Sequence, residues 1–157
     1  ILSEILTQPE GFPIFYEAGT PNLPGIVALG AGVEFIERAG IQNIKNKKAE
    51  IVKSWMAELE PIPGISAYYD PEHNSFANFC FNIDNFVPEE VGYILESSYD
   101  IHVRSGLHCA PLLLEPLGVH PWGTVRASPS YFTTAEESKA FVEAVKEVAE
   151  MAAKKKR

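Results

Sequence analysis

The residues best suited to chemistry lie in the stretch 104–111, which reads RSGLHCAP. Cys109 stands there between a glycine and a proline, with Arg104 before it and Arg126 after it along the chain. A thiol attacks as its thiolate, a form that nearby positive charge favours. The planar guanidinium of arginine can bind a carboxylate through two parallel hydrogen bonds. The combination predicts covalent chemistry by Cys109 on an amino acid or a similar small acid.

Composition sets the class of protein. The 157 residues are 46% hydrophobic and 22% charged, which favours a folded domain over a disordered chain. The chain has 13 basic and 21 acidic residues, a net charge of −8, and its basic cluster is confined to 154–157. This balance argues against nucleic acid as a partner. No apolar run reaches the roughly 20 residues of a membrane-spanning helix, so no membrane partner is expected.

The chain ends and the cysteines indicate its context. The sequence begins at Ile1 without Met or a signal pattern, which predicts a segment joined to preceding sequence. Its two cysteines lie in different settings, Cys80 in an apolar alternation and Cys109 in a loop. A disulfide scaffold is therefore not expected, and a reducing compartment, the cytoplasm, is.

The elements that must position these residues follow from hydrophobic periodicity and capping signals. An irregular arm over 1–22 precedes a C-terminal small domain over 23–157. Helices are expected over 24–38 and 41–60, from 88, and from 134 to the C-terminus, and strands over 65–69, 76–83, 101–105 and 124–128. This order predicts an α+β fold, a small and mostly antiparallel sheet with helices packed on one face.

Three motifs occur in register along the chain. They are EAGTPN at 17–22, RSGLHCAP at 104–111, and GTVRAS at 123–128 followed by YFTTAEE at 131–137. Together they resemble the C-terminal portion of class V aminotransferase-fold enzymes, in the cysteine desulfurase and selenocysteine lyase branch. The resemblance implies the C-terminal small domain of a fold-type I transferase dependent on pyridoxal 5'-phosphate (PLP).

The same resemblance implies a role for each site residue. Cys109 is the nucleophile that takes sulfur from L-cysteine, which leaves alanine and a persulfide on the enzyme. Arg126 binds the substrate α-carboxylate, and Arg104 resembles a second active-site arginine. Gly19 and Thr20 resemble the loop that reaches the cofactor phosphate of the partner subunit, which implies a homodimer. A sulfur-acceptor protein is a further candidate partner.

Each role has a plain structural alternative. Cys109 could be an inert buried thiol, and Arg126 could form a structural ion pair. Gly19 and Thr20 would also suit an ordinary turn before a helix cap. His108 is a candidate auxiliary residue that either orients or deprotonates, or else serves only the turn. Structural roles are expected for the remaining cysteine and histidines, which have no metal-site spacing: Cys80, His73, His102 and His120.

The family's Schiff-base lysine lies in a larger preceding domain, so this chain alone is expected to be inactive. The first hypothesis is therefore the C-terminal part of a PLP-dependent cysteine desulfurase. The second is a selenocysteine lyase or another class V aminotransferase-type enzyme that does not use Cys109. The third is a non-catalytic, free-standing domain for association or binding.

Overall fold

The computed structural model describes residues 11–17, 19–70 and 77–155. The chain divides into two compact units, residues 1–41 and 42–157. The sequence places a domain boundary at 22/23, whereas the helix that follows this point falls within the first unit.

The first unit contains a short 3-10 helix, η1 (Ile14–Tyr16), and helix α1 (Leu23–Ala39). Asn22 is the predicted cap: its side-chain oxygen accepts a hydrogen bond from the Gly25 backbone N–H at 3.1 Å. Gly40 ends the helix at φ 80°. No residue of α1 is buried, and apolar side chains are exposed along it, namely Leu23, Ile26, Val27, Leu29, Val33 and Ile36. Such a surface is typical of an interaction site.

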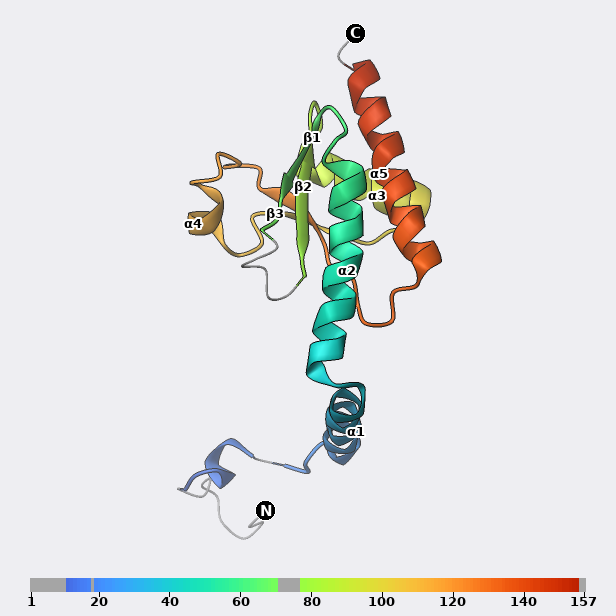
Figure 1. The fold of residues 1–157 in the computed structure, drawn as a ribbon. Coiled ribbons are helices and arrows are strands. Elements are labelled where there is room, and N and C mark those ends of the chain that lie inside the picture. Colours follow the sequence, from blue (N-terminus) through green and yellow to red (C-terminus); the bar gives the residue numbers. More distant parts are fainter. Residues whose placement is uncertain (1–10, 18, 71–76, 156–157) are drawn as a thin grey trace. The chain divides into compact units, whose positions relative to one another are not determined.

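The second unit is built on a four-stranded antiparallel sheet in the order β1–β2–β4–β3 (Figure 1). The strands are β1 (Ile65–Tyr68), β2 (Phe79–Ile83), β3 (Arg104–Gly106) and β4 (Thr124–Ala127). The helices are α2 (Ile41–Leu59), α3 (Pro88–Tyr99), α4 (Pro111–Leu114) and α5 (Ala135–Lys155). The predicted α+β class is confirmed.

One face of the sheet forms the core with α2, α3 and α5 (Figure 1). Alternate strand residues point to opposite faces, so the apolar set of β2 and β4 shares this side. The largest buried apolar side chains of this core, from strands and helices together, are Phe79, Phe81, Leu59, Leu95, Val52, Val91, Val125, Val145 and Val148. Among the helices within the described ranges, none is long and apolar enough to cross a membrane.

One strand differs from its predicted bounds, and one short helix was not predicted. The strand expected over 101–105 is β3 at Arg104–Gly106, because the chain is still completing the end of α3 before it. Asp100 is left-handed at φ 55°, and the Ile101 backbone N–H donates to the Leu95 carbonyl. The segment after Cys109, for which no element was predicted, contains α4, where Pro111 suits a first helical turn.

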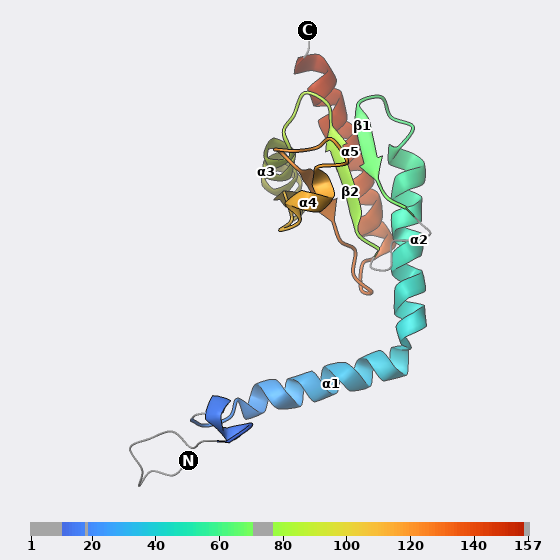
Figure 2. The same cartoon turned by 90° about the vertical axis from the view of Figure 1, so that its left-hand side faces the viewer.

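The other face of the sheet carries polar side chains, and of the described helices the short α4 lies on this side. The loop 107–123, with α4 in it, lies on this side, opposite α2 and α5 (Figures 1 and 2). Cys80, Asn82, Thr124 and Arg126 alternate with the buried apolar residues of β2 and β4, so they point to this face. The sheet therefore separates a helix-covered core from a polar surface next to the Cys109 loop.

Candidate active site

Strand register places two arginines and a cysteine in one row across the sheet. Cys80 on β2 is paired with Arg126 on β4, and Arg126 is paired with Arg104 on β3. Residues directly opposite each other on neighbouring strands project to the same face. The polar face therefore carries Cys80, Arg126 and Arg104 side by side, and we call these three residues the arginine row.

The loop after β3 turns through an unusual backbone. His108 and Cys109 are both left-handed, at φ 55° and 58°. This region costs about 1 kcal/mol or more for each residue that has a Cβ, so surrounding contacts must hold it. One such contact joins Gly106 and Gly123: a Cβ on Gly123 would clash with the Gly106 carbonyl. This close approach of β3 and β4 ties down both ends of the loop.

Cys109 is exposed at the outside of this turn and contacts Arg104. The Arg104 Nη2 donates a hydrogen bond to the Cys109 sulfur over 3.1 Å. A guanidinium in this position stabilises negative charge on a sulfur, as a nucleophilic thiolate requires. The interpretation of Cys109 as a buried, inert thiol does not fit its exposure.

Arg126 lies in the middle of the arginine row and is half-buried. Its Nε is buried and has no hydrogen-bond partner among the described residues. A buried donor without an acceptor is costly, and a carboxylate would satisfy it. Among those residues, no carboxylate forms a salt bridge with Arg126. The described residues therefore do not support the alternative role of Arg126 in a structural ion pair.

His108 points inward rather than toward solvent. Its Nε2 lies 2.9 Å from the Thr124 hydroxyl oxygen, while its Nδ1 is buried without a partner among the described residues. Burial lowers the pKa of His108 below its ordinary 6.5, and the charges of Arg126 and Arg104 lower it further. The folded protein thus favours the neutral imidazole.

This lowered pKa predicts a pH-dependent stability. The unfolded chain takes up the His108 proton first as pH falls below about 6.5. The contribution of His108 to the free energy of unfolding is therefore complete above that pH and is lost as pH falls through the lower folded value. Urea unfolding between about pH 5.5 and 7.5 should show this decline in the wild type and a weaker one in His108→Asn, since Asn tolerates a left-handed backbone.

The control for this measurement is His102→Asn. His102 is exposed and lies 3.6 Å from carboxylate oxygens of Glu96 and Asp100, away from the arginine row. The decline attributed to His108 should persist in this variant. An identical decline in wild type and His108→Asn would contradict the assignment.

Thr124 was not predicted to belong to this site, and Cys80, for which a structural role is expected, lies in it. Thr124 is fully buried, and its position two residues before Arg126 could have placed it on the same face. Cys80 belongs to the arginine row. Burial raises the pKa of its thiol, although contacts with Thr124 and Arg126 act in the opposite direction.

Gly19 and Thr20 lie in the first unit. Both are exposed, Gly19 has φ 94°, and the position of a Cβ on Gly19 is open space. An open backbone turn with a hydroxyl just before a helix N-terminus fits a phosphate group. The Asn22 cap also matches the plain alternative of a turn before a helix.

Two of the histidines for which structural roles are expected remain. His120 is exposed, and His73 lies outside the described residues. No group of three or more His, Cys, Asp or Glu within the described ranges could hold a metal ion.

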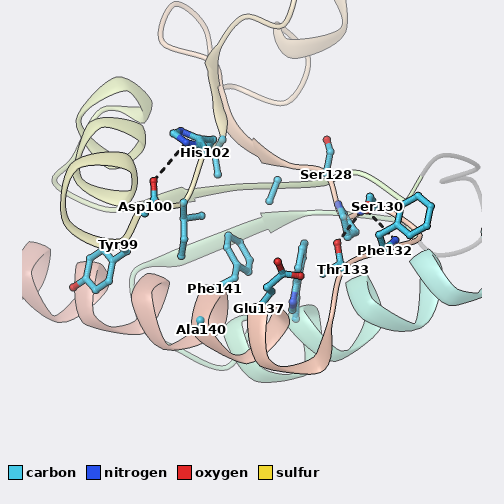
Figure 3. Close-up of a pocket in the computed structure, with 15 residues that line it drawn as sticks. Tyr99, Asp100, His102, Ser128, Ser130, Phe132, Thr133, Glu137, Ala140 and Phe141 are labelled. Atoms are coloured by element: carbon cyan, nitrogen blue, oxygen red, sulfur yellow. Dashed lines mark hydrogen bonds and ion pairs between the residues drawn. The ribbon is translucent and has the colours of Figure 1, made fainter. Parts of the chain in front are cut away.

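A cavity of about 470 Å³ opens on the opposite side of β4 from Arg126 (Figure 3). Phe141 and Ala140 of α5 lie at its base, and Ser128, Ser130 and His102 lie on its rim. Ala127, which faces the core, contributes to it, whereas Cys109 and both arginines do not. Part of its lining belongs to the motifs at 123–128 and 131–137, but those motifs predicted no cavity.

Known proteins that are similar to this chain include cysteine desulfurases. A probable cysteine desulfurase of Methanothermobacter thermautotrophicus is 39% identical over 143 residues, 90% of this chain and 36% of that protein. A cysteine desulfurase of Cronobacter sakazakii is 34% identical over 125 residues, 80% of this chain and 30% of that protein.

A solved structure of a cysteine desulfurase is also similar to this chain. The apo cysteine desulfurase from Thermococcus onnurineus NA1 superposes with a TM-score of 0.76 at 33% identity, covering 88% of this chain and 34% of that one. The chain thus spans about a third of the length of these relatives. The family description for aminotransferase class-V matches residues 4–141. The chain belongs to the aminotransferase class-V family.

Proposed function

We propose that this chain is the C-terminal part of a homodimeric, PLP-dependent cysteine desulfurase. The observation that carries the proposal is the exposed Cys109 sulfur, which accepts a hydrogen bond from Arg104. Arg104 is paired across the strands with Arg126, whose Nε has no hydrogen-bond partner among the described residues. The relatives named as cysteine desulfurases support the substrate, L-cysteine.

The residues of this chain divide the work between binding and attack. Arg126 binds the α-carboxylate of the substrate through its guanidinium, which satisfies its buried Nε. The Cys109 thiolate, supported by Arg104, attacks the substrate sulfur. An S–S bond forms, the substrate C–S bond breaks, and its electron pair remains on carbon. Carbon then takes up a proton, so that cysteine and enzyme thiol become alanine and enzyme persulfide.

Gly19 and Thr20 would hold the cofactor phosphate of the partner subunit, since their exposed turn fits an anion. PLP, when bound, supplies an electron sink for the charge left on the substrate carbon. The lysine that anchors it belongs, in this proposal, to a preceding domain, and the chain alone is inactive. The enzyme works in the cytoplasm and passes its sulfur to an acceptor protein.

The experiment requires the protein that contains this chain together with the preceding domain. With PLP and L-cysteine this protein should form alanine. Mass spectrometry of the peptide that contains Cys109, without reductant, should detect one added sulfur atom. Alanine formation without any sulfur on Cys109 would refute the proposed role of this residue.

A further inference from the structure

Thr124 occupies an unusual position for a polar residue. Thr124 is a polar residue, yet its exposed fraction is 0%, and no other polar or charged residue is buried in the part of the chain that the structure describes. It begins β4 on the polar face, directly opposite Gly106 at the end of β3. A buried hydroxyl needs hydrogen-bond partners, because an unsatisfied one costs about 1–3 kcal/mol. The identity of its partners therefore indicates what Thr124 does.

The hydroxyl of Thr124 has two partners, one on each side. Its oxygen lies 2.9 Å from Nε2 of His108, and on the other side Thr124 is near enough to the Cys80 thiol for a side-chain hydrogen bond that lowers the pKa of this thiol. A hydroxyl has one proton to donate. If that proton is donated to Cys80, the oxygen accepts from a protonated Nε2. If it is donated to His108, the imidazole proton lies on Nδ1.

The surroundings of Nδ1 decide between these two states. Nδ1 is buried without a partner among the described residues, and the charges of Arg126 and Arg104 act on the ring. An N–H at this atom would be a buried donor without an acceptor, in a positive field. A lone pair there is less costly, because orphaned donors are rarer in proteins than orphaned acceptors. These costs favour the state with the proton on Nε2, donated to Thr124.

We propose that Thr124 is a positioning residue for the Cys109 nucleophile. It holds His108 inside the loop as a neutral imidazole protonated on Nε2, and this anchor fixes the left-handed turn that presents Cys109 to Arg104. His108 is then a structural anchor and not an acid or base catalyst, because its unprotonated nitrogen is enclosed by protein. The inference rests on the proposed function only in naming Cys109 the nucleophile.

The first test is the tautomer of His108 in the 157-residue chain, without cofactor or substrate. Two-bond ¹H–¹⁵N spectra at pH 7.5 distinguish the two neutral forms, and His108→Asn assigns the signals. The wild type and Thr124→Ser should contain one form, protonated on Nε2. Thr124→Val, which removes the hydroxyl at nearly constant shape, and Cys80→Ala, which removes the acceptor of its proton, should contain a mixture.

The second test is the rate at which iodoacetamide alkylates Cys109, followed by mass spectrometry of its peptide. Without the anchor, Cys109 spends less time beside Arg104, so Thr124→Val should slow alkylation about fivefold, as expected for loss of one hydrogen bond. Thr124→Ser should keep the wild-type rate. The matched control is Thr133→Val, whose hydroxyl accepts from the Ser130 backbone N–H in the β4–α5 connection. It should also keep that rate.

A wild-type tautomer protonated on Nδ1 would overturn the proposal, and this result needs no variant to fold. Equal tautomers and alkylation rates in wild type and Thr124→Val would also overturn it. Neither test requires turnover. If the proposed desulfurase activity were refuted, the tautomer and alkylation results would still apply to Thr124. If the Thr124 proposal were refuted, the desulfurase activity would still be tested separately by its own assay.

Discussion

Replacing Cys109 by Ser is expected to reduce the formation of alanine from L-cysteine by at least about 100-fold, since the proposed covalent step loses its nucleophile. The serine hydroxyl has a similar shape but is almost entirely protonated at neutral pH, so it cannot attack sulfur as a thiolate can. Initial rates with saturating PLP, in the protein that carries the preceding domain, measure the effect.

This loss should occur without a loss of stability. Cys109 is exposed, so Cys109→Ser should change the free energy of unfolding by no more than about 0.5 kcal/mol. Selenocysteine is the informative second substrate. Turnover of selenocysteine that survives in Cys109→Ser, with none of cysteine in the wild type, would favour a lyase that does not use this thiol.

Replacing Arg126 by Lys is expected to lower kcat/KM for L-cysteine by about 10- to 100-fold, the range for losing hydrogen bonds between charged groups. Lysine keeps the charge but cannot donate two parallel hydrogen bonds to a carboxylate. Arg126 is half-buried, and its Nε has no hydrogen-bond partner among the described residues, so hydrogen bonds to a carboxylate should contribute strongly to binding there. The effect should be measured over a range of cysteine concentrations, so that KM and kcat are separated.

Cysteamine, which is cysteine without its carboxylate, separates binding from attack. If Arg126 binds the carboxylate, turnover of cysteamine should be nearly equal in wild type and Arg126→Lys. Arg104→Lys is the matched comparison, because Arg104 contacts the thiol and its loss should slow both substrates. An equal loss on both substrates in Arg126→Lys would contradict a carboxylate-binding role.

Features set by local sequence could be predicted. The alternation in β2 and β4 assigned Phe79 and Phe81 to the core and Cys80 to the opposite face. The Asn22 cap and the helix after it follow from residues within one turn of each other. The glycine and proline around Cys109 indicated an exposed loop, and Cys109 is exposed.

Features that depend on distant contacts could not be predicted. The inward position of His108 follows from a hydrogen bond to Thr124, 16 residues away in the chain. The left-handed turn at two successive residues with side chains has no local preference behind it, so only tertiary contacts can hold it. The pairing of Arg104 with Arg126 required the strand register, and the sequence placed that strand too early.

The arginine row also shapes the electrostatic field of the molecule. The whole chain has a net charge of −8, yet within the described residues neither guanidinium is neutralised by a salt bridge to an acidic side chain. An amino acid zwitterion that approaches the polar face of the sheet would therefore be drawn by its negative end to these two guanidinium groups. It arrives already oriented, with its carboxylate leading, before any direct contact is made.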